Sequence, residues 1–221
     1  KAPFMVINAI LQARKVLKQQ RPDVVLAMGG YVTGPTGIAA KSLGIPLVIH
    51  EQNAVAGMSN KWLAKFANRV LAAFPSAFAS GKAELVGNPV RQSVVDIPKR
   101  EISSPINMLV VGGSLGAQVL NQTLPEAFKR LNDTCAINVW HQTGKGHFAS
   151  VSESYQQQQM GDEQVTVAEF IDDMDTAYSW ADIVICRAGA LTVSEIAAAG
   201  KMAVFVPFPH AVDDHQTANA Q

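Results

Sequence analysis

The segment from Cys186 to Gly200 carries side chains that could bind a ligand beside a predicted strand end. An apolar run ends at Cys186, and a helix is predicted over 192–199. Thr192 and Glu195 have the spacing of a capping box, in which a hydroxyl and a carboxylate satisfy free backbone N–H groups at a helix start. Alternatively, the Glu195 carboxylate accepts hydrogen bonds from ligand hydroxyl groups. The spacing alone leaves both interpretations open.

A second candidate site follows the apolar run that ends at Val111. The segment Gly112–Ala117 is rich in glycine and precedes a predicted helix, and backbone N–H groups at a helix start can bind an anion. We therefore expect a phosphate site there. The segment lacks the G-x-G-x-x-G spacing of dinucleotide-binding proteins, and the next strand ends in His141-Gln142-Thr143, without the acidic residue that holds a ribose. Both observations argue against NAD.

Two strand ends in the first half of the chain have a similar character. Gly29 and Gly30 follow Met28, and glycines let a backbone approach a ligand closely, although a simple tight turn explains them equally well. His50 is followed by Glu51-Gln52-Asn53, a polar cluster larger than a turn requires. We interpret this cluster as ligand-binding.

Two further strand ends in the second half are interpreted as structural. Asp172 or Asp173 is expected to N-cap the helix that follows Ala168. The loop after Val206 contains residues that could suggest a metal site, but an N-cap at Asp214 explains it more simply. These potential metal ligands are His210, Asp213, Asp214 and His215.

The elements that must position these residues are short β-rich runs that alternate with helical runs. Continuous Val/Ile/Leu strands alternating with helices predict an α/β fold with parallel sheets covered on both faces. The predicted strands are Val24–Met28, Leu47–His50, Val70–Ala73, Met108–Val111, Ile137–His141, Val165–Ala168, Ile183–Cys186 and Ala203–Val206. The clearest predicted helices are Phe4–Lys18, Ala117–Leu131 and Thr192–Ala199.

Two lobes are predicted, because segments 22–53 and 181–216 share one order of motifs. Each has an Asp before an apolar strand, a turn with glycine, a helix with Ala-Ala, and a second strand. Two unrelated βαβ units would give the same order. Segment 86–107 contains three prolines without periodicity and is interpreted as a linker, with a boundary near Arg91. Ligands of open α/β sheets bind at the carboxyl ends of strands, so these polar strand ends predict a cleft for a phosphorylated ligand.

The composition excludes several other classes of protein. The 221 residues are 48% hydrophobic and 16% charged, and 18 Lys and Arg balance 18 Asp and Glu. The absence of a basic stripe argues against nucleic-acid binding. No apolar run approaches the roughly 18 residues of a spanning helix. Cys135 and Cys186 lie in apolar runs and are expected to be reduced core thiols. Both ends of the chain are expected to be cut.

Eight motifs follow one another along nearly the whole chain: MGGYVTGPTGIAA, HEQNAVAGMSNKWLA, VGNPVR, VVGGSLGAQVLNQTLP, WHQTGK, EFIDDM, CRAGALTVSEIAAAG and PHAVDDHQTANA. Together they resemble the motifs of the MurG family of bacterial peptidoglycan N-acetylglucosaminyltransferases. The resemblance implies the two-lobed GT-B glycosyltransferase fold and inverting transfer of N-acetylglucosamine from UDP-N-acetylglucosamine to lipid I, which forms lipid II. It also implies no metal and no cofactor.

The resemblance also implies roles for individual residues. Glu195 would bind the ribose hydroxyls and Ile171 would read uracil through its backbone. Ser114 and the amides around Gly113 would hold the diphosphate, together with the turn and helix start formed by Ala190, Leu191, Thr192, Val193 and Ser194. Arg91 would lie near the nucleotide, and Asn53 and Gln216 would contact the sugar. Tyr31 and Glu51 would lie on the acceptor side.

The implied lobes are 1–91 for acceptor and membrane and 92–221 for the UDP-sugar donor. The implied partners are UDP-N-acetylglucosamine, lipid I, the membrane surface and other cell-wall synthesis proteins, at the cytoplasmic face of the plasma membrane. A basic amphipathic helix fits such peripheral binding. Its apolar residues are Phe4, Ile7, Ile10 and Leu11, followed by Arg14, Lys15 and Lys18.

The chain departs from the family pattern in two ways. The family's Gly-rich loop with a His, a proposed catalytic base, would precede Lys1, so we expect the isolated chain to form no lipid II. Leu115 stands where Gln is common. A UDP-sugar epimerase of the same fold and a two-lobed small-molecule binding protein are the alternative interpretations.

Overall fold

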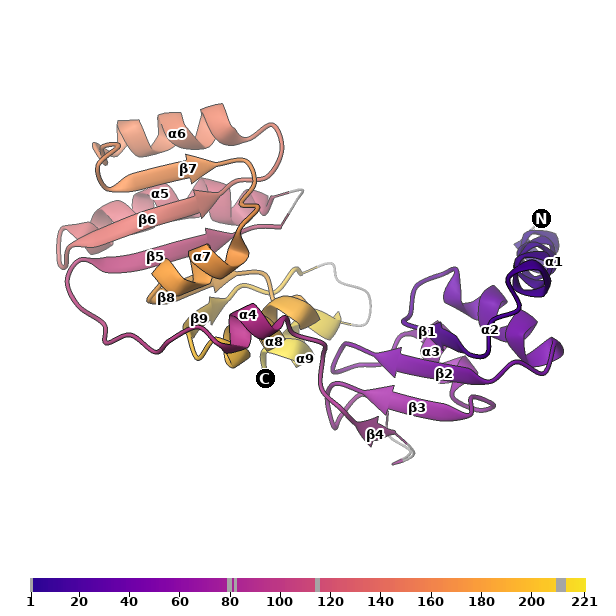
Figure 1. Cartoon of the computed structure of the whole chain (residues 1–221). Coiled ribbons are helices and arrows are strands. Elements are labelled where there is room, and N and C mark those ends of the chain that lie inside the picture. The colour runs from indigo at the N-terminus through magenta and orange to yellow at the C-terminus, as the bar shows by residue number, and fades with distance from the viewer. Residues whose placement is uncertain (1, 79–80, 82, 114–115, 210–213) are drawn as a thin grey trace. The chain divides into compact units, whose positions relative to one another are not determined.

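The chain forms two units in a computed structural model that describes residues 2–78, 81, 83–113, 116–209 and 214–221 (Figure 1). The first unit contains the described residues up to Pro89 together with residues 214–219, and the second unit begins at Val90. The sequence assigned everything after residue 91 to the second lobe. That assignment fails for residues 214–219, because Asn219 is buried in the first unit, where its Oδ1 accepts the backbone N–H of Ala54 at 2.8 Å.

The first unit is built on a parallel sheet with strand order β1-β2-β3-β4. Its strands are β1 (Val25–Ala27), β2 (Leu47–Glu51), β3 (Arg69–Ala72) and β4 (Glu84–Leu85). Its helices are α1 (Ala2–Gln20), α2 (Thr33–Ser42), α3 (Met58–Leu63) and α9 (His215–Ala220). The sequence predicted the first three strands to within a residue or two and missed the two-residue strand β4.

One face of this sheet packs on helices. Leu47 and Ile49 of β2 are fully buried against Leu17 of α1, Ala40 of α2 and Leu63 of α3. On β1 the alternate residue Leu26 is 56% exposed, since successive side chains of a strand point to opposite faces. The prediction that both faces are covered is therefore wrong at β1 within the described residues.

The second unit has a five-stranded parallel sheet with strand order β7-β6-β5-β8-β9. Its strands are β5 (Ile106–Val111), β6 (Ile137–Gln142), β7 (Val165–Ala168), β8 (Ile183–Cys186) and β9 (Met202–Phe205). Its helices are α4 (Gln92–Val95), α5 (Gln118–Asn132), α6 (Phe148–Gln157), α7 (Met174–Trp180) and α8 (Ala190–Ala198).

Both faces of this second sheet are covered at its centre, as predicted, but on the edge strand β9 Val204 is 50% exposed. Val110 of β5 packs into a cluster with Leu120 and Phe128 of α5, whereas its neighbour Leu109 packs on the other face with Tyr178 of α7 and Ile196 of α8. Successive residues of this strand point to opposite faces of the sheet, and both faces are buried there. This explains why the apolar runs in the sequence are continuous.

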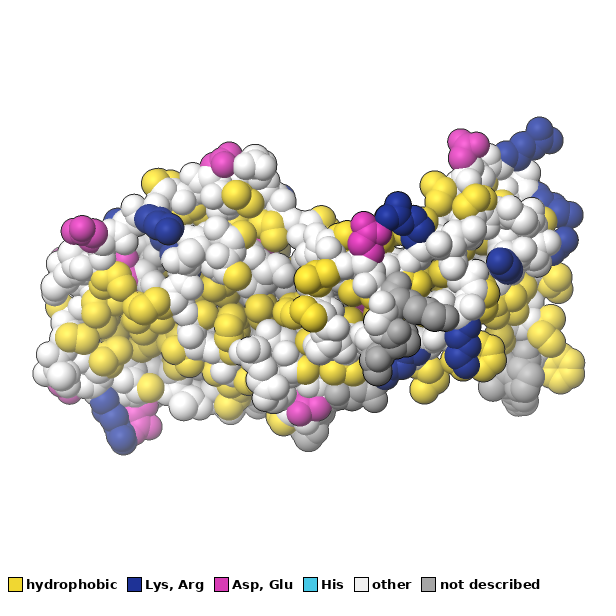
Figure 2. All heavy atoms as spheres, turned by 90° about the horizontal axis from the view of Figure 1, so that it is seen from below, with side chains coloured by type: hydrophobic (Ala, Val, Ile, Leu, Met, Phe, Trp, Pro, Cys, Tyr) yellow, Lys and Arg dark blue, Asp and Glu magenta, His cyan; other side chains and the backbone are white. Residues whose placement is uncertain are grey.

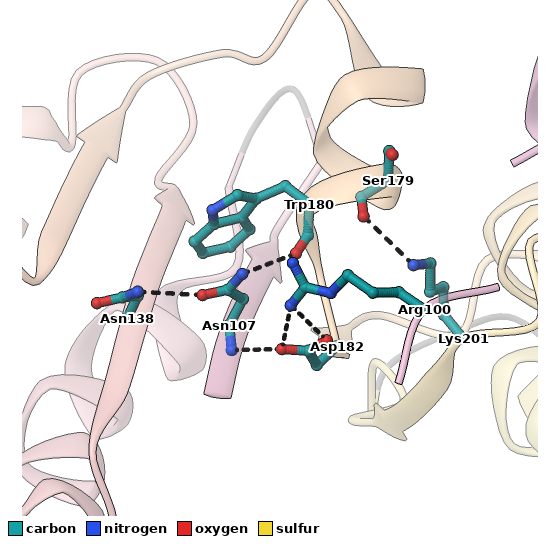
Figure 3. A network of polar contacts seen from close by, with 7 residues as sticks. All are labelled: Arg100, Asn107, Asn138, Ser179, Trp180, Asp182 and Lys201. Atoms are coloured by element: carbon teal, nitrogen blue, oxygen red, sulfur yellow. Dashed lines mark hydrogen bonds and ion pairs between the residues drawn. The ribbon is translucent and has the colours of Figure 1, made fainter. Parts of the chain in front are cut away.

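A polar network anchors the second sheet at the amino ends of its strands (Figure 3). The Asp182 carboxylate is buried and accepts two hydrogen bonds of 2.7 Å from Arg100 and one of 2.9 Å from the backbone N–H of Asn107. The Asn107 side chain continues the network to the carbonyl of Trp180 and to Asn138. The Asp that precedes this apolar strand therefore fastens the end of the linker segment to the sheet.

Both cysteines are free thiols, as predicted. Cys186 is fully buried, and burial raises the pKa of its thiol to about 12. Because the thiolate is the reactive form, Cys186 acts as a small apolar core residue.

Candidate functional site

The candidate site of the second unit lies where the strands of its sheet end. Val111 pairs with Gln142 on one side and with Cys186 on the other, and Gln142 also pairs with Ala168. The strands therefore end level with one another. The glycine turn after β5, the polar residues after β6 and the start of α8 consequently lie at one edge of the sheet, where open α/β sheets bind their ligands.

The glycine turn after β5 is held by the last residue of β6 and by the residue that follows it. The Gly113 carbonyl accepts hydrogen bonds from Gln142 Nε2 at 3.2 Å and from the Gly116 N–H at 3.0 Å. Gly116 has φ of +75°, and a Cβ at this position would lie 2.1 Å from the carbonyl oxygen of Thr143. Ser114 and Leu115 lie outside the described residues, so the predicted contact of Ser114 with the diphosphate stays a prediction.

A buried network connects this turn to the core. Asn121 Nδ2 donates to the Thr143 carbonyl at 2.9 Å, so the Asn121 Oδ1 is left to accept from His141 Nε2 at 3.0 Å. His141 Nδ1 then accepts the hydroxyl of Tyr155 at 2.8 Å. The imidazole is neutral in this arrangement, and burial lowers the pKa of His141 to about 4.

We expect the second unit to lose stability when the pH falls below the ordinary pKa of histidine. The folded-state pKa of His141 is depressed, so the unfolded chain binds the proton more tightly, and the stabilisation present above about pH 6.5 is lost toward pH 4. Between pH 7.5 and pH 5 the free energy of unfolding should fall by about 2 kcal/mol from this group. Urea denaturation at both pH values measures the change, and an NMR titration of the imidazole would contradict it by giving a pKa near 6.5.

Helix α8 begins two residues earlier than the sequence predicted. Its N-cap is Gly189, and no side chain caps it. The capping-box interpretation of Thr192 and Glu195 is therefore wrong, because Thr192 already lies inside the first turn. Backbone N–H groups at the start of a helix can donate to an anion, because the helix itself supplies them with no acceptor. The predicted turn Ala190–Thr192 lies at this helix start, so its role in binding the diphosphate stays a prediction.

Glu195 instead binds other side chains. Its Oε2 accepts the hydroxyl of Tyr178 at 3.1 Å, and its Oε1 lies 3.8 Å from Nη2 of Arg91. The side chain is 23% exposed, so the carboxylate is partly shielded but accessible. Arg91 is also paired with Asp175 at 3.0 Å. The structure thus brings the predicted residues Arg91 and Glu195 together and adds Tyr178 and Asp175, which the sequence did not identify.

The remaining predicted donor residues differ in exposure. Ile171 is buried among the core residues below α7, so only its backbone could contact a base, as the resemblance implies. Leu191 is 50% exposed, whereas Thr192, Val193 and Ser194 are half-buried. Ser194 Oγ donates to the Ala190 carbonyl at 3.0 Å, which ties its hydroxyl to the helix backbone.

In the first unit, Glu51 organises the loop that follows β2. Its carboxylate is buried and accepts hydrogen bonds from the N–H groups of Asn53 and Gly57 and from the side chains of Asn53 and Asn60, all within 3.2 Å. Glu51 therefore shapes this loop from within. The Asn53 side chain is additionally bonded to Asn219 of α9 at 3.1 Å.

A pocket of the first unit lies at the carboxyl ends of β1 and β2. It is lined among others by Gly29, Gly30, Gln52, Asn53 and His215. Gln216, the residue after His215, is half-buried on α9. Tyr31 follows the glycines and is 90% exposed. The structure thus brings Asn53 and the start of α9 together, which the sequence placed in different lobes.

Two of the four potential metal ligands, His210 and Asp213, lie outside the described part of the chain. The described residues contain no group of three or more His, Cys, Asp or Glu that could hold a metal ion. Asp214 lies at the N-cap position of α9, where its Oδ1 accepts the hydroxyl of Thr217 at 2.7 Å without capping the helix backbone. Asp173 does cap α7, as predicted, by accepting the Thr176 N–H at 3.0 Å.

Comparisons with known proteins identify the class that this fold and site define. Residues 107–221 match the glycosyltransferase family 28 C-terminal domain, and residues 1–72 match the N-terminal domain of the same family. The chain belongs to glycosyltransferase family 28.

Its most similar relatives in the comparisons share one specific name within this family. The chain is 81% identical over its whole length to a UDP-N-acetylglucosamine–N-acetylmuramyl-(pentapeptide) pyrophosphoryl-undecaprenol N-acetylglucosamine transferase of Pseudoalteromonas translucida, and 55% identical to that of Shewanella oneidensis. The crystal structure of MurG from Acinetobacter baumannii, 45% identical, superposes with a TM-score of 0.86 over 100% of this chain. The resemblance to the MurG family and the predicted GT-B fold are thereby confirmed.

The chain spans about 62% of the length of the first of these relatives and of the Acinetobacter protein. A putative UDP-N-acetylglucosamine 2-epimerase from Listeria monocytogenes also superposes, with a TM-score of 0.67 at 12% identity. That likeness concerns the fold alone.

Proposed function

We propose that the protein to which this chain belongs transfers N-acetylglucosamine from UDP-N-acetylglucosamine to lipid I and so forms lipid II. The observation that carries the proposal is the 81% identity, over the whole chain, to a relative named for this transfer. The strand ends of the second unit, with the start of a helix and a partly exposed carboxylate beside them, suit a nucleoside diphosphate.

In this proposal the second unit binds the donor. The N–H groups at the start of α8 and the turn at Gly113 hold the diphosphate, Glu195 accepts the ribose hydroxyls, and the backbone at Ile171 reads uracil. Asn53 and Gln216 contact the sugar, and Tyr31 lies on the acceptor side. The reaction uses the nucleotide sugar as its only small-molecule substrate besides the lipid, with no metal or cofactor.

A chimeric enzyme tests the transfer. The 221 residues replace the aligned segment of the Pseudoalteromonas relative, and the chimera is supplied with radiolabelled UDP-N-acetylglucosamine and lipid I. We expect labelled lipid II to form. A chimera that is folded and binds UDP but transfers no label would contradict the proposal. The same chimera with Glu195→Ala distinguishes transfer at this site from background labelling.

We further propose that the protein binds the cytoplasmic face of the membrane peripherally through α1. Phe4, Ile7 and Leu11 are 79%, 54% and 59% exposed, whereas Ile10 packs against the core. Apolar side chains with Lys and Arg beside them are visible on the first unit, at the right of Figure 2. Such a combination suits an anionic lipid surface. Among the described residues, no helix is both long and apolar enough to cross a bilayer.

Charging two of these residues should weaken membrane binding. We expect the Phe4→Glu, Ile7→Glu variant to bind phosphatidylglycerol vesicles at least about tenfold more weakly, because two apolar contacts are lost and two repulsive charges are added. Vesicle co-sedimentation measures this. Phe148→Glu with Val119→Glu, which charges exposed residues of the second unit, is the matched control. Equal binding by the parent and the α1 variant would refute the membrane role of α1.

A further inference from the structure

The buried hydroxyl of Tyr178 points toward Glu195, the residue proposed to bind the ribose. Tyr178 is 1% exposed, and its ring packs among core residues of α7, α8 and the sheet. Its hydroxyl donates to Glu195 Oε2 at 3.1 Å. An ionised carboxylate can only accept, so the phenol proton lies on this hydrogen bond. Burial and the Glu195 charge raise the pKa of Tyr178, which therefore remains a donor at neutral pH.

The other oxygen of Glu195 faces the guanidinium of Arg91. Arg91 Nη2 lies 3.8 Å from Oε1 and 3.0 Å from Oδ1 of Asp175. Asp175 and Tyr178 both belong to α7, one turn apart. Helix α7 therefore contacts one oxygen of the carboxylate directly, through Tyr178. It influences the other oxygen indirectly, because its Asp175 is paired with Arg91.

A vicinal diol requires a defined orientation of the carboxylate that binds it. Its two hydroxyls must donate to two acceptors at the same time, and the terminal torsion of a glutamate is otherwise broad. A carboxylate has about four lone-pair positions, so Oε2 can accept from Tyr178 and still accept from a ligand. Fixing one oxygen fixes the plane of the carboxylate and hence the position of the other.

We propose that Tyr178 is a positioning residue for nucleotide binding, which holds the Glu195 carboxylate in the orientation that receives both ribose hydroxyls. This inference rests on the proposed role of Glu195 in binding the donor ribose. It gives the hydroxyl of Tyr178 a function beyond core packing, since a phenylalanine ring would fill the same space among the same neighbours.

The test is the Tyr178→Phe variant, titrated calorimetrically with UDP and with 2′,3′-dideoxy-UDP, which lacks the diol. We expect the affinity for UDP to fall about three- to tenfold, in line with the loss of one hydrogen bond, and the affinity for the dideoxy nucleotide to stay unchanged. Tyr155→Phe is the matched control, because it removes a buried phenol hydroxyl of the same unit that is bonded to His141 instead. This control should leave the ratio of the two affinities unchanged.

A double-mutant cycle separates this inference from the proposed role of Glu195. Adding Tyr178→Phe to Glu195→Ala should cause no further loss of UDP affinity, and a further loss would overturn the inference. Equal weakening of both nucleotides by Tyr178→Phe would also overturn it, since that is the result of a purely structural role. If Glu195→Gln weakens UDP binding but Tyr178→Phe does not, only the positioning role fails. If Glu195→Gln leaves UDP binding unchanged, the proposed ribose contact fails as well.

Discussion

Gly116→Ala is expected to destabilise the second unit by roughly 3 kcal/mol, the sum of a strained positive φ and an overpacked contact. The added Cβ would lie 2.1 Å from the carbonyl oxygen of Thr143, a backbone atom that cannot move aside alone. The same carbonyl accepts the Asn121 side chain, so the buried network at His141 would be displaced too. Urea denaturation of the second unit measures the loss, and UDP titration should show binding reduced beyond detection.

Gly146→Ala separates the two contributions to this effect. Gly146 belongs to the same unit and has φ of +81°, but no atom lies within 4 Å of its Cβ position. Its substitution should cost only about 1 kcal/mol, the penalty of the left-handed backbone conformation. Equal effects of the two substitutions would show that the close approach of Gly116 to Thr143 does not constrain the turn.

Glu195→Gln is expected to weaken UDP binding by about 1–2 kcal/mol, roughly five- to thirtyfold, with a nearly unchanged melting temperature. The amide oxygen of Gln can still accept the Tyr178 hydroxyl, so the folded structure keeps its contact. A ribose diol loses the charged acceptor, whose hydrogen bonds are worth roughly 1.5–3 kcal/mol against about 1 kcal/mol for a neutral one. Calorimetric titration of UDP into the parent and the variant measures the difference.

Glu195→Ala gives the complementary result. It removes the diol contact and also leaves the buried Tyr178 hydroxyl without the acceptor it has in the structure, which should lower the free energy of unfolding by about 1–3 kcal/mol. Helix capping does not contribute, because the N-cap of α8 is Gly189. UDP binding to Glu195→Gln that is as tight as to the parent would exclude Glu195 as the ribose ligand.

The sequence predicted the features that depend on residues close together in the chain, such as strands and a helix N-cap. Apolar runs predicted the parallel strands other than β4 to within one or two residues, because buried strands are continuous in Val, Ile and Leu. An N-cap at Asp172 or Asp173 was predicted, and Asp173 is the cap, since its partner Thr176 lies within the same turn. The prediction that Thr192 caps α8 was wrong, although its spacing to Glu195 fits a capping box. The helix begins earlier, with Gly189 as its N-cap, and the spacing alone does not show this.

Contacts between distant residues were not predictable in this way. Tyr178 and Glu195 are separated by 17 residues, and only the packing of α7 beside α8 brings them together. Gln142 was seen as part of a strand end, yet its bond to Gly113 depends on the register of β5 with β6. Glu51 was expected to face a ligand, but its loop folds around the carboxylate.

The placement of Asn219 has a consequence for protein synthesis. The first unit is assembled from residues at the beginning of the chain and from α9, which is separated from them by the entire second unit. On the ribosome, residues 90–209 of the second unit therefore emerge while the first unit still lacks the partner of the Ala54 N–H. The loop after β2 therefore lacks its contact with Asn219 until the whole segment between them has been translated.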